Sequence, residues 1–173
     1  MEGIGDRTAQ RAALESFARE RPAAILYDPE APALYDVFSG KALPLEWRRV
    51  ARVAEARNAE TGAPYLAVLR DDGRQVLLAD VGLAFAPSTA STGPLPGLPP
   101  VVCFRDFAAT EGRLAHYLLD HPEDPVTRSH LDLFAFLLAV LDGARDVGFD
   151  VSREERRLEA LLAEIEARRA GGA

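Results

Sequence analysis

The sequence predicts an α+β protein in which a small antiparallel sheet in the N-terminal half packs against a C-terminal layer of about three helices. Short apolar runs separated by turn residues fill residues 1–86, whereas apolar residues at helical spacing fill residues 101–173. Residues 87–100 form a connection rich in Pro, Gly, Ser and Thr, which no helix or central strand can include. We expect these parts to form one compact domain.

The first part of the chain is expected to begin with a helix over residues 6–20, capped by Asp6. Two short runs of strand-forming residues, 23–28 and 33–38, are bounded by prolines and predict edge strands. Residues 44–57 fit a helix with an apolar face and an arginine-rich face, with a twisted strand as the alternative.

A β-hairpin is predicted over residues 65–80, because Asp72-Gly73 supplies the positive backbone angles of a tight turn between two apolar runs. Residues 81–86 either extend the second strand or add a third strand after a bend at Gly82. The N-terminal half therefore contains an antiparallel sheet.

Three helices are expected after the connection. The first spans residues 104–120, and Asp124-Pro125 caps and starts a second that runs to about Asp146. The second helix is apolar nearly all round between Leu131 and Leu141, which predicts a central helix covered on several sides. A capping box at Ser152–Glu155 opens the third helix.

Composition limits the classes of function. A net charge of −7 argues against a nucleic-acid platform, which needs a basic face. The longest apolar helical run is too short to cross a membrane, and the charged N-terminal residues do not resemble a secretory signal, so we expect a cytoplasmic protein. Abundant alanine and arginine are typical of a GC-rich, bacterial genome. The single cysteine, Cys103, lies between apolar residues and is expected to be a buried thiol.

Glu111 is the first candidate functional residue, because it falls in the middle of the apolar stripe of the 104–120 helix. A buried carboxylate needs a partner. The structural interpretation is an ion pair or hydrogen bond to an arginine or backbone group of the sheet. The functional interpretation is a small enzyme in which Glu111 and His116, His130 or a nearby aspartate form an acid/base pair.

Arg48, Arg49 and Arg52 are the second candidate group, because guanidinium groups bind phosphate bidentately. Their run resembles that of the cyclic-dinucleotide-binding PilZ domains, but the second element of that motif, an acidic residue or Asn followed by Ser and Gly at set spacing, is missing. No residue role is therefore carried over from that family. A small-molecule or nucleotide sensor using these arginines remains an alternative function, and a solvated face is the structural interpretation.

The three histidines are the third candidate group. They lie within one short segment and are interspersed with aspartates, and these residue types ligate divalent metals. Their spacing matches no established metal motif, so we assign no metal and no cofactor. The residues concerned are His116, His121, His130, Asp120, Asp124 and Asp132.

No catalytic or phosphate-binding motif is present, so the leading hypothesis is a non-catalytic interaction or regulatory protein that binds a protein partner or self-associates. Two surfaces support this hypothesis. The first is an apolar stripe on the last helix, formed by Leu158, Leu161, Leu162 and Ile165, and the second is a face of small residues, formed by Ala135, Ala139 and Gly143. Packing within the chain would also explain both surfaces.

Overall fold

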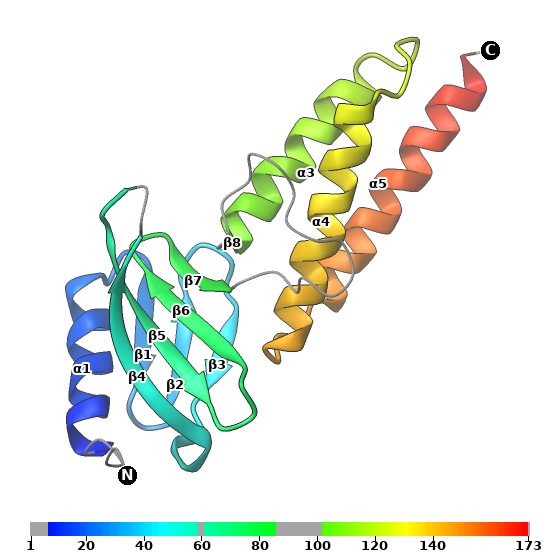
Figure 1. The fold of residues 1–173 in the computed structure, drawn as a ribbon. Coiled ribbons are helices and arrows are strands. Elements are labelled where there is room, and N and C mark those ends of the chain that lie inside the picture. The colour runs from blue at the N-terminus through cyan, green and yellow to red at the C-terminus, as the bar shows by residue number, and fades with distance from the viewer. Residues whose placement is uncertain (1–6, 59–60, 86–101, 173) are drawn as a thin grey trace. The chain divides into compact units, whose positions relative to one another are not determined.

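The computed structural model describes residues 7–58, 61–85 and 102–172. The chain divides into two compact units, residues 1–86 and 87–173, which we call the sheet unit and the helical unit and describe separately. The α+β fold class is confirmed, since antiparallel strands dominate the first unit and helices the second (Figure 1). The Pro-rich connection at 87–100 lies outside the described residues, as does the expected cap Asp6.

In the sheet unit the elements are α1 (Arg7–Glu20), β1 (Ile25–Asp28), β2 (Ala33–Asp36), β3 (Ala42–Pro44), the 3₁₀ turn η1 (Trp47–Arg49), β4 (Val50–Arg57), β5 (Pro64–Arg70), β6 (Gln75–Ala79) and β7 (Gly82–Phe85). In the helical unit they are β8 (Val102–Cys103), α3 (Phe104–Leu119), α4 (Arg128–Asp146) and α5 (Ser152–Gly171).

Strands β1, β2 and β3 form an antiparallel sheet in chain order. Ile25 and Leu34 are buried, whereas the cross-strand pair Leu26 and Tyr35 is exposed, as expected for a sheet with one covered face. β2 is therefore a central strand, and the expectation of an edge strand at 33–38 is wrong. Its second neighbour, β3, was missed because three residues that end in Pro44 give almost no strand signal.

Strands β4 to β7 pair antiparallel in chain order, which confirms the hairpin and makes β7 the third strand that follows the bend at Gly82. The hairpin loop differs from a two-residue turn. The Arg70 N–H donates to the Arg74 carbonyl at 2.8 Å, and Gly73 alone in the loop has a positive φ, of 82°. Such a three-residue loop with glycine in the left-handed region is a common hairpin connection.

The favoured helix over 44–57 is wrong. A short 3₁₀ turn, η1, is followed by the strand β4, and the register of β4 against β5 shifts between Val50 and Arg52. This bulge adds one residue to the strand and interrupts the alternation of apolar and charged positions. The sequence pattern therefore lost its two-residue period and looked helical.

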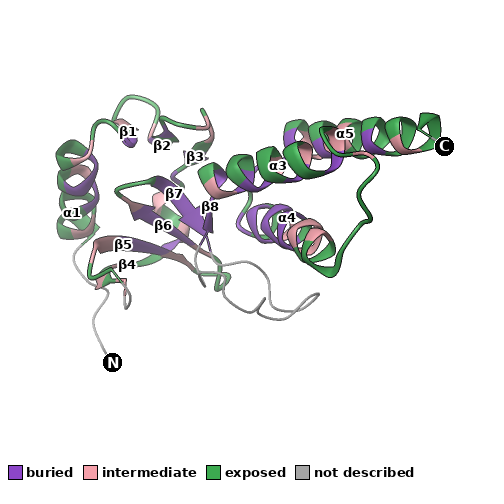
Figure 2. Cartoon of the chain, turned by 90° about the horizontal axis from the view of Figure 1, so that it is seen from above, coloured by how far each residue is buried: buried purple, intermediate pink, exposed green. Residues whose placement is uncertain are grey.

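The core of the sheet unit lies between its two sheets, which contact each other through β2 and β7. In Figure 1, strands β1–β3 lie behind β4–β7. Leu34 from the first sheet and Leu78 and Leu83 from the second are completely buried. Helix α1 contacts β1 and β4, and Figure 2 shows its buried side turned toward the strands.

Asp36 is a buried charged side chain between the sheets, and it is only 2% exposed. Its Oδ2 accepts a hydrogen bond from the Leu83 N–H at 2.7 Å, and its Oδ1 accepts one from the Ser39 N–H at 2.8 Å. Gly82, with φ +106°, lets the backbone of β7 approach this carboxylate; a Cβ atom at position 82 would lie 2.2 Å from Oδ2. Asp36 and Gly82 together therefore fix how β2 meets β7.

In the helical unit, α3 packs against both α4 and α5. The start of α4 differs from expectation: Thr127 is the N-cap, in place of Asp124, and its backbone N–H donates to His130 Nδ1 at 3.1 Å. The expected capping box of α5 is also replaced. The Asp150 carboxylate accepts from the backbone N–H of Ser152 at 3.0 Å and from its hydroxyl at 2.6 Å.

Candidate functional site

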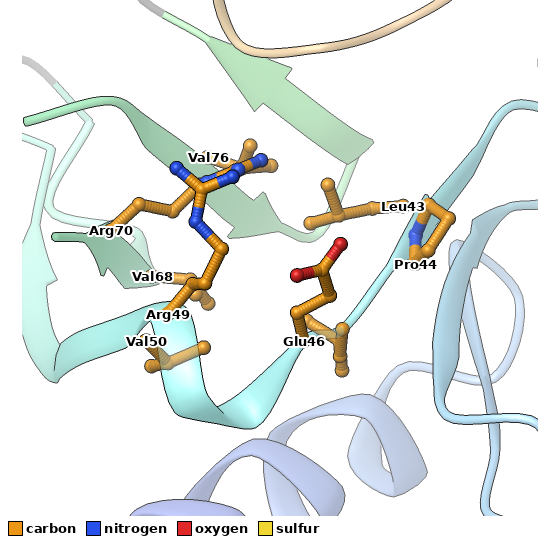
Figure 3. A pocket seen from close by; sticks show the side chains of 9 residues that line it. Leu43, Pro44, Glu46, Arg49, Val50, Val68, Arg70 and Val76 are labelled. Carbon is orange, nitrogen blue, oxygen red and sulfur yellow. The ribbon is translucent and has the colours of Figure 1, made fainter. Parts of the chain in front are cut away.

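A hollow in the sheet unit lies between η1, β3 and the ends of β4 to β6 (Figure 3). Its cavity volume is about 30 Å³, which holds one or two water molecules but no organic metabolite. The charged groups of its lining are Glu46, Arg49 and Arg70, and the remaining lining residues are Leu43, Pro44, Leu45, Val50, Val68 and Val76.

Arg49 has carboxylate partners in the hairpin loop. Its Nη2 lies 2.9 Å from Asp72 and its Nε 3.3 Å from Asp71. Burial tends to raise the pKa of Asp72, but the backbone N–H of Arg74 and the neighbouring arginines outweigh that effect, so the pKa is lowered. Arg49 is thus bound to the hairpin loop.

The other two arginines of the candidate phosphate site do not join Arg49. Nη2 of Arg48 lies 3.5 Å from Oε2 of Glu46, and the Arg48 side chain extends into solvent. Arg52 is exposed on β4. Adjacent arginines that face different carboxylates are typical of a solvated, charged surface, in which each exposed ion pair contributes little to stability.

Glu111 has the arginine partner expected for a structural role, but on a different element. Its Oε1 lies 2.6 Å from Nη2 of Arg157 in α5, so the ion pair joins two helices and does not reach the sheet. The Glu111 side chain is 12% exposed, and its Oε2 is buried without a hydrogen-bond partner among the described residues. The helical pattern therefore located this carboxylate correctly, while its partner is set by the packing of α3 on α5.

The histidines proposed as partners of Glu111 are engaged elsewhere. His116 Nδ1 lies 2.9 Å from Asp120, and His130 Nδ1 accepts from the N-cap of α4. The rings of His116 and His121 lie 5.8 Å apart between centroids. Across residues 7–58, 61–85 and 102–172, no three His, Cys, Asp or Glu side chains are arranged to hold a metal ion.

Cys103 is buried, as expected, and lies just before α3. Its backbone N–H donates to Asp106 Oδ2 at 2.9 Å, and its Sγ lies 3.4 Å from the same oxygen. Burial raises the pKa of the Cys103 thiol from 9.0 to about 11, and the negative charge of Asp106 acts in the same direction. A thiol in this state is a poor nucleophile at neutral pH.

The raised pKa of Cys103 predicts an alkaline loss of stability. Its contribution is fully present below the unfolded-state pKa of 9.0 and is lost as the pH rises toward the folded-state pKa of about 11. We expect the free energy of unfolding of the wild type to fall by about 2 kcal/mol more than that of Cys103→Ala between pH 8 and pH 11. Urea titrations of both proteins measure this difference, and parallel pH profiles would contradict it.

An exposed apolar stripe runs along α4. It consists of Leu131, Phe134, Ala135 and Leu138, and we call it the α4 stripe. Leu131 is 55% exposed and Leu138 53%, while Phe134 and Ala135 are half-buried. The opposite side of α4 carries the buried residues Leu137 and Val140. The expectation of a helix covered on several sides is therefore wrong for this stripe.

The two surfaces that the sequence favoured for interaction are each covered in part. Leu158 and Ile165 of α5 are buried, Leu161 is half-buried and Leu162 is 36% exposed, so the packing of α5 against α3 accounts for part of that stripe. Of the small-residue face, Ala139 and Gly143 are buried as well. The α4 stripe was missed because apolar residues all round a helix do not reveal which of them stay uncovered.

Comparisons with protein-family models, with curated proteins and with solved structures found no match for this chain. None of the helices in the described part of the chain is long and apolar enough to span a bilayer. The residues themselves therefore carry the functional argument.

Proposed function

We propose that this chain is a non-catalytic, cytoplasmic interaction protein of a bacterium, and that it works through the α4 stripe. One observation carries the proposal: apolar side chains at positions i, i+3, i+4 and i+7 of one helix stay accessible, including two leucines that are more than half exposed. Single exposed leucines are common in proteins, but a continuous apolar stripe rimmed by charged residues is typical of a protein-binding surface.

The contacts of the candidate catalytic groups also favour binding over catalysis. Glu111, the strongest candidate acid or base, is paired with Arg157, and Arg49 is paired with the hairpin loop. The hollow beside Arg49 and Arg70 has room for water alone. These groups therefore have structural roles that account for their positions.

Site-specific photocrosslinking tests the proposal. A photoreactive amino acid is placed at Leu138 in the full chain, produced in its native host, and a matched variant carries it at Ala163, an exposed position of α5 outside the stripe. We expect discrete crosslinked products from position 138 and none from position 163. Equal crosslinking at the two positions, or none at either, would overturn the proposal.

A further inference from the structure

Charged residues of opposite sign lie at the two ends of the α4 stripe. Positions 128, 131, 135, 138 and 142 follow one another at spacings of three and four residues, so they form one line along α4. Arg128 stands at one end of this line with a side chain that is 90% exposed, and Asp142 stands at the other end. The centre of the line is Ala135.

The residues of this line lie at nearly equal distances before and after Ala135. Arg128 and Asp142 lie seven residues to either side of Ala135, and the two exposed leucines lie four residues before it and three residues after it. If two α4 helices crossed antiparallel at Ala135, Leu131 of each would lie beside Leu138 of the other. Each Arg128 would then meet an Asp142 of the second copy, at about 10 Å along the helix from the centre. The small side chain of Ala135 allows close approach at the crossing point.

A parallel pair of α4 helices would not bring these opposite charges together. It would set Arg128 against Arg128 and Asp142 against Asp142, and like charges directly opposite are unfavourable. The partners that these residues have within the chain do not prevent pairing. Arg128 lies 3.7 Å from Asp132, and Asp142 lies 2.9 Å from Arg145, which also pairs with Glu155 of α5. All of these ion pairs are exposed, and exposed ion pairs hold their side chains weakly.

We propose that the α4 stripe binds a second copy of this chain, in a two-fold dimer whose α4 helices pack antiparallel with Arg128 of each copy beside Asp142 of the other. The inference rests on the proposed function, because it names the partner that the stripe binds. One helix-on-helix contact buries less area than a standard interface, so the dissociation constant is expected in the range of ~1–100 μM.

Charge exchange tests the arrangement by sedimentation velocity over a concentration series of the full chain. Arg128→Asp and Asp142→Arg are each expected to raise the dissociation constant at least about tenfold, because each places like charges across the interface. The double variant carries the same two charges exchanged and is expected to return to within about threefold of the wild type. Both single substitutions suit the helix dipole, so α4 is expected to stay folded.

The outcomes separate this inference from the proposed function. A wild type that stays monomeric up to millimolar concentration, a dimer that Leu138→Asp leaves intact, or a double variant as weak as the single variants would each overturn the antiparallel dimer. If the chain is monomeric and position 138 crosslinks to a different protein, the dimer is wrong and the proposed function stands. A crosslinked product of twice the chain mass of 18.8 kDa, lost on Arg128→Asp, supports both.

Discussion

Replacement of Gly82 with alanine is expected to destabilise the sheet unit by about 3 kcal/mol or more. Two effects add. The new Cβ would lie 2.2 Å from Oδ2 of Asp36, and the backbone φ of +106° is one that residues with a side chain rarely adopt. Asp36 cannot simply move aside, because the Leu83 and Ser39 N–H groups hold both of its oxygens. Urea unfolding followed by circular dichroism measures the loss.

Gly73→Ala is the matched control for this substitution. Gly73 also has a positive φ, of 82°, but a Cβ there would meet no heavy atom within 4 Å. Its cost is therefore limited to backbone strain, about 1 kcal/mol. If both variants lost the same stability, the close approach of β7 to Asp36 would contribute nothing, and the explanation given for Gly82 would be wrong.

Asp36→Ala is expected to cost about 2–4 kcal/mol, because it leaves the buried Leu83 N–H and the part-buried Ser39 N–H without their acceptors. Asp36→Asn is expected to be destabilising as well. An asparagine side chain has one acceptor oxygen where the structure uses two, and its NH₂ group would face an N–H donor. The free energy of unfolding of each variant, again from urea titration, checks the order wild type, Asn, Ala.

A double-mutant cycle tests whether Asp36 and Gly82 act on each other or contribute to stability independently. In Asp36→Ala/Gly82→Ala the new Cβ at position 82 no longer meets a carboxylate, so the total loss is expected to be at least about 1 kcal/mol smaller than the sum of the single losses. Strict additivity would mean that Asp36 and Gly82 do not act on each other.

Local sequence signals located the elements whose causes are local. Asp72-Gly73 identified the hairpin, and helical spacing identified α3 almost to the residue. Elements fixed by contacts elsewhere were misjudged. A bulge concealed β4, and β3 was too short to recognise. The start of α4 depends on hydrogen bonds between Thr127 and His130, whereas Asp124-Pro125 was the stronger sequence signal for a helix start.

The candidate sites show the same division. Glu111 stood out because the period of its helix placed a charge among apolar residues, but its partner Arg157 is 46 positions away and only packing reveals it. The link between Asp36 and Gly82 left no signal, since an aspartate near a turn and a glycine in a bend are each unremarked in a sequence. The α4 stripe could be identified only from the structure, which shows that the opposite side of the helix is buried.

The strand order of the sheet unit has a consequence for how the chain folds. Each strand in β1–β3 and in β4–β7 pairs with its neighbour in sequence, so both sheets are built from short-range hairpins that can form quickly. The hydrogen bond from Leu83 to Asp36 joins positions 47 residues apart and requires closure of a much longer loop. The rate-limiting step of folding is therefore expected to be the docking of two preformed meanders, with Asp36 losing its water as they meet.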